Sequence, residues 1–261
     1  MKEIRVGSWT ELHEQLFAGS WHEELGRHRS NFAFRGRADS DDDLSTSLIK
    51  LGGDAPTLEG HLVRNFRKYA ARDSVPVDSL WNWLSLGQHH GLPTRMLDWT
   101  YSPYVALHFA TSRLEHFDRD GGIWMVDYVR VHQHLPAPLR ERLEAEGANV
   151  FTTEMLGAVA RDFGELARFG GEFTVFVEPP SFDDRIINQY ALFSLTSRPA
   201  TAFDRWLANH PDLARRLIVP AELKWEVRDK LDQAGINERV LFPGLDGLTR
   251  WVTRYYAPRH P

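Results

Sequence analysis

The segment 88–100 holds the densest group of side chains that could do chemistry in this 261-residue chain. Imidazole, hydroxyl, guanidinium, carboxylate and indole groups follow one another there, between two stretches with helical periodicity. Binding and catalytic groups tend to gather in loops between well-defined elements. We therefore expect this segment to be a loop that contributes binding residues, namely His89, Thr94, Arg95, Asp98 and Trp99.

Three roles are open to Asp98 in this pattern. It follows Arg95 by three positions, so the two side chains could form a structural ion pair. It could instead accept hydrogen bonds from loop amides, or orient His89 for proton transfer. We favour a mixed arrangement, in which Asp98 holds the loop while His89 and Arg95 contact the ligand.

Two further motifs supply polar groups closer to the N-terminus. Arg35 and Gly36 end a stretch in which aromatic residues alternate with others, as in a half-buried strand. The segment 44–48 is interpreted as a short extended piece that carries the hydroxyls of Thr46 and Ser47. Polar groups in separate motifs are costly to bury unless they serve one site or network. We therefore expect one cleft lined by Arg35, Ser47, His89, Thr94, Arg95 and Asp98.

The residue types present exclude several kinds of catalysis. The chain has no cysteine, which excludes thiolate nucleophiles and cysteine-ligated metals. GxSxG, GxxxxGK[ST] and GxGxxG motifs are also absent from the sequence. The 12 histidines show no HExxH spacing, so no metal site is expected. The acidic run 39–43 is interpreted as a solvated loop, and the remaining groups suit a phosphorylated ligand better than covalent catalysis.

Helical and strand patterns alternate along the chain. Ser8 followed by Glu11, and Ser102 followed by proline, predict two helix starts, and Asp78 is the expected N-cap of a third. Strands are expected near 32–36, 123–129, 173–177, 191–196 and 217–220. No repeat or linker is evident. The sequence therefore predicts a single compact α/β (α+β) domain, with a mixed or antiparallel core sheet surrounded by helices.

The charge and hydrophobicity of the sequence limit the kinds of partner that we expect. The formal net charge is −5 and the pI is about 6.2, so the globally basic footprint of a nucleic-acid binder is missing, although a local basic groove remains open. No stretch of about 20 apolar residues occurs, and the N-terminus has no apolar signal region. We expect a soluble, cytoplasmic protein with no membrane partner.

Several of these motifs together resemble one known family. They are Phe34-Arg35-Gly36, the segments 44–48 and 88–100, Arg185-x-x-x-Gln189 and the closing segment 241–248. In these residues the chain is similar to the FRG domain, which is named for its Phe-Arg-Gly motif. The resemblance implies an FRG domain over residues 25–255, with residues 1–24 as an N-terminal strand and helix packed on it.

The FRG resemblance implies a layout similar to that of ADP-ribosyltransferases of the Arg-Ser-Glu type, with NAD as the substrate. By this resemblance Arg35 would hold an NAD phosphate, and Thr46 or Ser47 would frame the nicotinamide site. A late Glu or Gln would assist attack at the ribose, a role open to Gln189, Glu172 or Glu178.

Together with the residues singled out above, this gives a set of expected site residues. Expected catalytic residues are Arg35, Ser47, His89 and Gln189, and expected NAD-binding residues are Arg35, Gly36, Thr46, Thr94, Arg95, Asp98 and Trp99. The function expected is NAD-dependent ADP-ribosylation of nucleic acid or protein, by a toxin or phage-defence effector. Two alternatives stay open: a non-catalytic nucleotide-binding or interaction module of the same fold, and a nuclease.

Overall fold

The structure, a computed structural model, describes residues 1–71 and 74–259. Its strands are β1 (Lys2–Arg5), β2 (Trp21–His22), β3 (Arg27–His28), β4 (Phe32–Arg37), β5 (Met96–Thr100), β6 (Gly121–Asp127), β7 (Phe151–Thr152), β8 (Thr174–Glu178), β9 (Ala191–Thr196) and β10 (Ala214–Val219). Its α-helices are α1 (Trp9–Phe17), α2 (Ser47–Leu51), α3 (Ala55–Tyr69), α4 (Leu80–His89), α5 (Pro103–Ala110), α6 (Tyr128–His132), α7 (Ala137–Glu146), α8 (Thr153–Val159), α9 (Phe163–Arg168), α10 (Asp184–Asn188), α11 (Phe203–Ala208), α12 (Lys224–Gln233), α13 (Glu238–Leu241) and α14 (Leu245–Tyr255).

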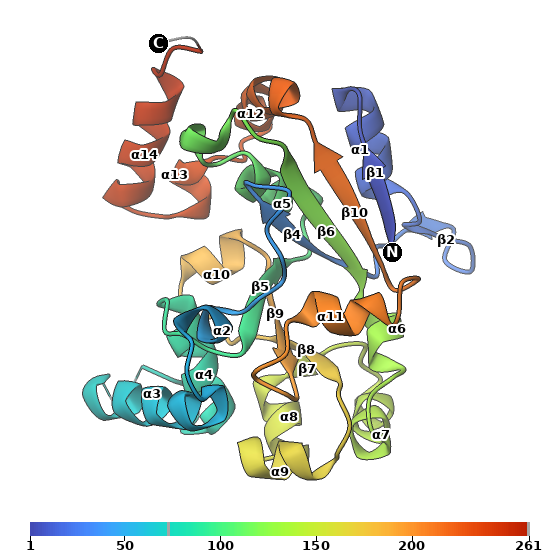
Figure 1. Ribbon diagram of the computed structural model, residues 1–261, viewed down its shortest axis with the longest axis vertical. Helices are drawn as coiled ribbons and strands as arrows, with labels where there is room; N and C mark the ends of the chain where they lie inside the picture. Colours follow the sequence, from blue (N-terminus) through green and yellow to red (C-terminus); the bar gives the residue numbers. More distant parts are fainter. Residues whose placement is uncertain (72–73, 260–261) are drawn as a thin grey trace.

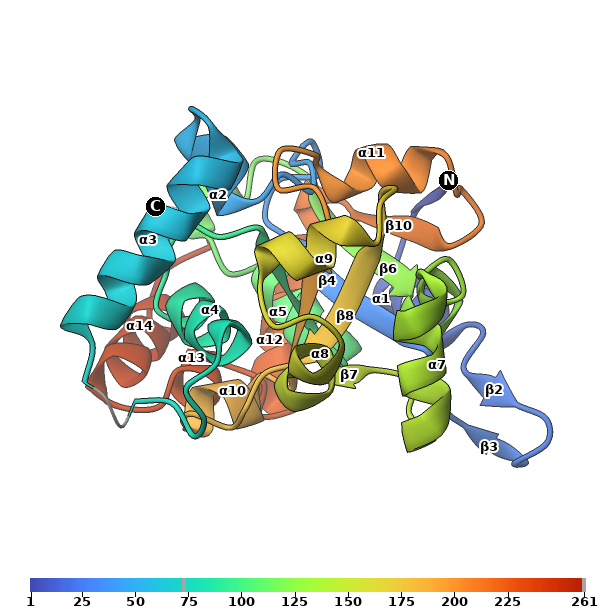
Figure 2. The same ribbon diagram turned by 90° about the horizontal axis from the view of Figure 1, so that it is seen from below.

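A mixed sheet of eight strands runs through the described residues, in the order β1-β10-β6-β4-β5-β9-β8-β7 (Figure 1). The two outer pairs, β1 with β10 and β7 with β8, are parallel, and the neighbours between them are antiparallel. Helices surround this sheet, and the small hairpin of β2 and β3 projects from one side (Figure 2). The expected fold class is therefore confirmed.

The sheet is divided at its centre. Strand β4 pairs with β6 over six residues, and β5 pairs with β9 over five. Between β4 and β5, in contrast, the described chain forms one register pair, Phe34 with Thr100. We call this junction the seam. The sheet thus consists of two half-sheets, β1-β10-β6-β4 and β5-β9-β8-β7, that meet at the seam.

Three buried clusters hold the helices against the sheet. One face of the half-sheet that contains β4 packs against α1, α5 and α12, in a cluster that includes Phe34 and Leu217. The opposite face, which continues across the seam, packs against α11 through Trp99 and Phe203. A third cluster, which includes Trp81, packs α4 and α8 against the other side of β5, β9 and β8.

Two helix starts agree with the capping signals in the sequence. The Ser8 and Ser102 hydroxyls each accept a hydrogen bond from the backbone three residues ahead, at 3.2 and 3.3 Å. Helix α4 starts differently, because Ser79 rather than Asp78 is its N-cap. The Asp78 carboxylate instead accepts from the Trp83 indole at 2.7 Å.

The segment 44–48 departs from the expected extended structure. Residues 44–46 have no regular structure, and Ser47 begins α2. Thr46 is the N-cap of this helix, because its Oγ1 accepts from the amide of Ile49 at 3.2 Å. A hydroxyl that bonds a nearby amide in this way offers the backbone an alternative to strand pairing. The expectation of an extended segment here is wrong.

The segment 88–100 is not a single loop either. Helix α4 continues to His89, and residues 96–100 form β5, at the centre of the sheet. All of β5 except Asp98 is buried, since helices cover both of its faces. A strand buried on both faces shows no alternation of apolar and polar residues, which is why the sequence pattern did not indicate it.

Gly36 allows β4 to approach α5 closely. A Cβ atom at this position would lie 1.8 Å from the carbonyl oxygen of Ala106 and 2.7 Å from the amide nitrogen of Ala110. Both are backbone atoms of α5, which a side-chain rotation cannot move away. The glycine is therefore required by the packing of this helix on the sheet.

None of the helices in the described part of the chain is both long enough and apolar enough to cross a membrane.

Candidate functional site

A cavity of about 200 Å³ lies at the seam, and we call it the seam cavity. It is bounded by β4, β5 and β9, by α5, and by the end of α4 together with α10. It is lined by Phe34, Arg35, Gly36, Arg37, His89, Asp98, Trp99, Thr100, Phe109, Arg185, Gln189, Ala191 and Phe193.

Arg35 spans the seam. Its Nη1 donates to the carbonyl oxygen of Asp98 on β5, beyond the point where the two strands pair, and lies 3.7 Å from the Asp98 carboxylate. The Nε atom is buried and has no hydrogen-bond partner among the described residues. Burial lowers the pKa of Arg35, and the charge of Asp98 opposes this shift. Because arginine is not deprotonated in proteins, the guanidinium stays charged. Arg35 thus joins the half-sheets and still retains an unused donor.

Two more arginines line the seam cavity. Arg37 lies two residues beyond Arg35 on β4, so the two side chains leave the strand on the same face. Its Nη2 lies 2.6 Å from the Asp42 carboxylate. Arg185, from α10, donates to the carbonyl oxygen of His89 at 3.4 Å. Within the described chain, the Nε atoms of both Arg37 and Arg185 are buried without a partner, as in Arg35.

His89 connects α4 to α10 in the cavity wall. Its side chain is 6% exposed, and its Nε2 donates to the carboxylate of Asp183, the N-cap of α10, at 2.7 Å. Burial raises the pKa of Asp183, but hydrogen bonds from His89 and the Ile186 amide outweigh it and lower the pKa overall. The partner of His89 is therefore Asp183 and not Asp98.

Gln189 reaches the cavity from the end of α10. Its side-chain Nε2 donates to the carbonyl oxygen of Leu241 in α13 at 2.9 Å. The backbone carbonyl oxygen of Gln189 accepts from the hydroxyl of Thr100 at 2.7 Å. Gln189 is thus held between β5 and the C-terminal helices.

Asp98 is the exposed member of a short polar chain. Its side chain is 58% exposed, and its carboxylate accepts from Gln88 Nε2 at 2.9 Å. Gln88 Oε1 in turn accepts from the hydroxyl of Thr94 at 2.6 Å. Thr94 is fully buried and does not line the cavity. Thr94 supports the site through Gln88, and Asp98 faces Arg35.

Arg95 lies away from the cavity. It is 4% exposed, and its Nε and backbone amide donate to the two carboxylate oxygens of Glu59, at 2.6 and 2.9 Å. Its guanidinium lies 4.2 Å from the ring centroid of Phe163. Of the three roles open to Asp98, an ion pair with Arg95 is excluded, because the fully buried Glu59 takes that position. Arg95 therefore does not share a cleft with Arg35.

The two hydroxyl residues of α2 also lie outside the cavity. Thr46 caps the helix, as described above. Ser47 Oγ accepts from the backbone amide of Thr94 at 3.2 Å, which fastens α2 to the turn before β5. The structure does not bring Ser47 to the cavity that holds Arg35 and His89.

One of the three candidates for a late catalytic Glu or Gln shares the cavity with Arg35, and it is Gln189. Glu178 lies elsewhere, at the end of β8, where it accepts from the hydroxyl of Tyr101 at 2.8 Å. Glu172 is exposed in the turn before β8, and it is not among the lining residues.

Trp99 contributes to the core more than to the cavity. It is 3% exposed, and its indole nitrogen donates to the hydroxyl of Ser194 at 2.8 Å. Its ring packs edge-on against those of Phe176 and Phe203. The cavity borders Trp99, but the indole has its partners inside the protein.

Sequence reasoning did not single out Arg37 or Phe109 as site residues, and it used Arg185 only as part of a family motif. The signal for Arg37 was present, since residues two apart on a strand share a face. Phe109 carries no such signal, because its place in the wall depends on how α5 crosses β4.

Taken together, the seam cavity is cationic. Three guanidinium groups line it, against one carboxylate, that of Asp98. The guanidinium fork matches the geometry of phosphate and carboxylate oxygens. No group of three or more His, Asp or Glu side chains among the described residues is arranged to hold a metal ion.

Comparison with known proteins gives one match. Residues 30–119 match the family model of the FRG domain, which confirms the resemblance drawn from the motifs over that range. The match contains β4, α2 to α5 and β5, and therefore Arg35, His89 and Asp98. No curated protein and no solved structure matches the chain.

Proposed function

Residues 30–119 match the family model of the FRG domain, and from this premise we propose that the seam cavity binds the phosphate groups of a nucleotide. One observation supports this most directly. Each of the three arginines that line the cavity has a buried Nε donor with no partner in the described chain.

The energetics of such donors favour an anionic ligand. An unpaired buried donor costs on the order of 1–3 kcal/mol, and buried polar groups are normally paired. Three such donors on the arginines of one small cavity are therefore unusually unfavourable. Phosphate oxygens accept from guanidinium forks in short, charge-assisted bonds, so a small shift of each side chain would satisfy the donors.

The acidic partners present leave the arginines available. The carboxylate of Asp98 is 58% exposed, and that of Asp42, beside Arg37, is 38% exposed. Exposed ion pairs contribute roughly 0–1 kcal/mol, so a ligand phosphate can replace them at little cost. NAD is the nucleotide that the FRG resemblance implies, and it carries two phosphates.

The test measures binding of NAD, ADP and inorganic pyrophosphate by isothermal titration calorimetry. In Arg35→Lys and Arg37→Lys the charge remains but the fork is lost, so we expect affinity to fall by about tenfold or more. Arg168→Lys, at an exposed position in α9 away from the cavity, is the matched control and should bind as the wild type does.

Melting temperatures accompany these titrations, because Arg35 also joins the half-sheets. A folded Arg37→Lys variant keeps the test valid if Arg35→Lys is unstable. The proposal fails if the wild-type protein binds none of the three anions. It also fails if both cavity variants bind them as tightly as the control.

ADP-ribosyl transfer is a second candidate, and the presence of Gln189 in the same cavity as Arg35 favours it. In this reaction the bond between ribose C1′ and nicotinamide breaks, and its electron pair leaves with nicotinamide. A nucleophile of the acceptor then bonds to C1′ and loses its proton. Gln189 would orient the ribose without supplying charge, while Arg35 holds phosphate, so both would act as the cationic ribose develops.

Release of nicotinamide from labelled NAD decides between binding and transfer. We expect Gln189→Ala to retain NAD affinity while nicotinamide release falls by about 10² or more, a typical loss for a group that acts at the transition state. Binding of NAD without any release of nicotinamide would rule out ADP-ribosyl transfer and would support nucleotide binding alone. Action as a toxin or phage-defence effector on nucleic acid or protein would follow from transfer, and growth arrest on expression of the wild type but not of Gln189→Ala would support it.

A further inference from the structure

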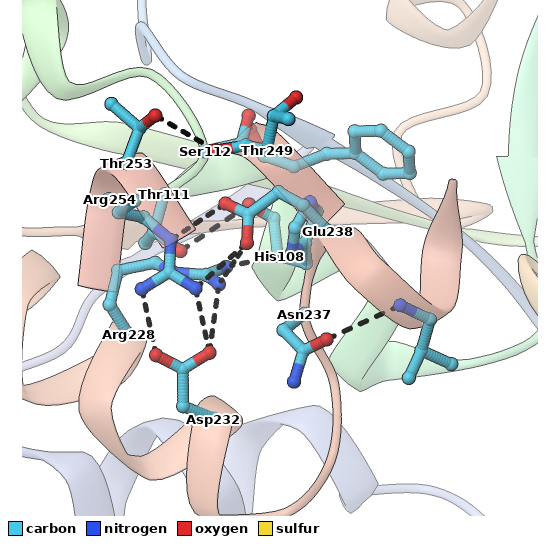
Figure 3. Close-up of polar contacts among 12 residues, drawn as sticks. His108, Thr111, Ser112, Arg228, Asp232, Asn237, Glu238, Thr249, Thr253 and Arg254 are labelled. Carbon is cyan, nitrogen blue, oxygen red and sulfur yellow. Dashed lines mark hydrogen bonds and ion pairs between the residues drawn. The ribbon is translucent and has the colours of Figure 1, made fainter. Parts of the chain in front are cut away.

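A second, larger cavity adjoins the first. It has a volume of about 660 Å³ and lies between the C-terminal end of α5 and the helices α13 and α14. Phe109 lines both cavities, so its ring forms part of the wall of each. We call this one the helix cavity. Figure 3 shows several of its residues, among them His108 from the last turn of α5, Ser112 just beyond that helix, and Thr249 and Thr253 from α14.

The two cavities differ in volume, and therefore in the size of ligand that each can hold. Sites for ligands of nucleotide size usually measure about 300–1,000 Å³. The seam cavity, at about 200 Å³, is below that range, whereas the helix cavity lies within it. A nucleotide whose phosphates bind Arg35 must therefore place most of its atoms outside the seam cavity.

We propose that the helix cavity receives the nucleoside of a nucleoside diphosphate whose phosphates occupy the seam cavity. This proposal rests on the proposed function, since it takes the phosphates to be bound by the seam arginines. It adds that the ligand is recognised through its base and ribose, by residues outside the matched FRG segment as well as within it.

His108 provides the most specific observation. Arg228 Nη1 lies 2.8 Å from His108 Nδ1, and arginine can only donate, so Nδ1 accepts and the imidazole proton is on Nε2. That Nε2 is buried and has no acceptor in the part of the chain that the structure describes. Burial, with the charge of Arg228 beside it, lowers the pKa of His108 to about 3, so the ring is neutral. The helix cavity thus has one buried donor without a partner, in a residue that lines it.

The hydroxyls of the cavity complement this donor. Thr253 donates to the carbonyl of Thr249 at 2.8 Å, and Thr249 and Ser112 likewise donate to backbone carbonyls. Because their protons are used, these oxygens offer lone pairs to a ligand. Ribose hydroxyls and the amino group of a base are donors of the required kind. The half-buried ring of Phe109 supplies the apolar surface against which a base can stack.

The floor of the helix cavity is held in place by ion pairs. Arg254 donates to both oxygens of Glu238, at 2.7 and 2.8 Å, and to both oxygens of Asp232, at 2.7 and 2.8 Å (Figure 3). The guanidinium of Arg228 lies 3.7 Å from each of these carboxylates. These charges balance one another, so they fix α13 and α14 rather than bind a ligand. Recognition of the nucleoside is therefore assigned to the unpartnered His108 and the hydroxyls.

The test compares ADP with inorganic pyrophosphate, which lacks a nucleoside, by isothermal titration calorimetry. Thr253→Trp adds an indole at an exposed position of α14, within the helix cavity. We expect it to weaken ADP by about tenfold or more, or 1.4 kcal/mol, and to change pyrophosphate affinity less than about twofold. Thr10→Trp, at an exposed position in α1, is the matched control and should bind both as the wild type does.

Each further outcome has a meaning of its own. Arg35→Lys should weaken both probes, since it acts on the phosphates. If ADP binds wild type no more tightly than pyrophosphate does, or if Thr253→Trp leaves ADP affinity intact, the helix-cavity proposal is overturned while phosphate binding stands. If neither probe binds, both proposals are overturned. Should Thr253→Trp not fold, Thr249→Trp, which adds the same bulk at another exposed position of α14 in the cavity, replaces it with the same expectation.

Discussion

Gly36 affects both the packing of α5 on the sheet and the position of the arginines in the seam cavity. It lies between Arg35 and Arg37, both of which line the seam cavity, and its lack of a side chain lets the backbone of α5 approach β4. The positions of the two guanidiniums therefore depend on a contact between strand and helix. A residue that binds nothing itself can in this way decide where the anion site lies.

Gly36→Ala should be strongly destabilising. Its Cβ would lie 1.8 Å from a backbone oxygen, so α5 would have to move, and we expect a loss of about 3 kcal/mol in the free energy of unfolding by urea. The control is Gly60→Ala in α3, where an added Cβ meets nothing within 4 Å. There the better helix propensity of alanine should add about 0.5–1 kcal/mol. A Gly36→Ala protein as stable as this control would disprove the close contact.

Arg95 allows a second test at this scale. Its charge is buried against Glu59, and removing one partner of a buried ion pair typically costs about 3–5 kcal/mol. We expect Glu59→Gln to lose that much stability and Arg95→Met/Glu59→Met to recover part of it. Anion affinity of the folded fraction should be unchanged in both, because neither residue lines the cavity. Loss of affinity without loss of stability would return Arg95 to the site.

At the scale of elements, local signals predicted more than long-range ones. The hydroxyl caps of α1 and α5 and the strand β4 can be identified within a few residues, and the structure confirms them. The alternation expected in β4 is not seen in its burial, because the neighbours Ala33 and Phe34 are both buried, on opposite faces of the sheet. The buried strand β5 has no such signal. The partners of Arg95 and His89 lie 36 and 94 positions away in the sequence, at Glu59 and Asp183. A pattern of neighbours cannot indicate them.

The candidate site divides in the same way. Arg35, His89, Asp98 and Gln189 were named from motifs, and the structure brings them to one cavity. Ser47, Thr94 and Arg95 also have polar side chains, but the two hydroxyls accept from backbone amides and the guanidinium donates to the buried Glu59. Residue type identified the candidates, and the fold determined which of them could face a ligand.

Helix α6 and strand β8 are joined by a histidine that must stay neutral. His132 Nδ1 donates to the Asn149 carbonyl at 2.9 Å, and its Nε2 accepts from the Phe176 amide at 2.8 Å. A proton on Nε2 would face that amide and break the bond. Burial accordingly lowers the pKa of His132 to about 4, from 6.5.

The protein should therefore lose stability in mild acid. Unfolded His132 takes up a proton below about pH 6.5 and folded His132 only near pH 4. Its contribution is complete above pH 6.5 and falls by up to about 1.4 kcal/mol per pH unit between these values. Urea unfolding at pH 7 and pH 5 should show a smaller difference for His132→Gln than for wild type. His61→Gln, at an exposed position, should behave as wild type; equal pH dependence in all three proteins would contradict this account.

At the scale of the whole molecule, the matched segment 30–119 does not contain its own sheet. It includes β4 and β5, which share one register pair, whereas their extensive partners β6 and β9 lie outside it. The C-terminal helices outside it also hold Gln189 and complete the helix cavity. The FRG segment is thus the centre of a larger domain.

We therefore expect a fragment of residues 30–119 to be unfolded. Two strands without their neighbours cannot bury a core, and a pair of strands alone is marginal in water. Circular dichroism and thermal melting of the fragment should show no cooperative transition, in contrast to the full chain. A cooperative melt of the fragment would show that the segment is an independent domain.

The two half-sheets share one register pair at the seam, whereas β4 and β6 share six. A ligand bound at the seam would contact Arg35 on one half-sheet and Gln189, which is hydrogen-bonded to β5 on the other. It would therefore connect two half-sheets whose strands share one register pair. Amide hydrogen exchange reports such a connection directly. The amides of β4 and β5 that border the seam should exchange more slowly when the cavity is filled, while those between β4 and β6 stay as they were. In that case the exchange rates of the seam amides would report whether a ligand is bound.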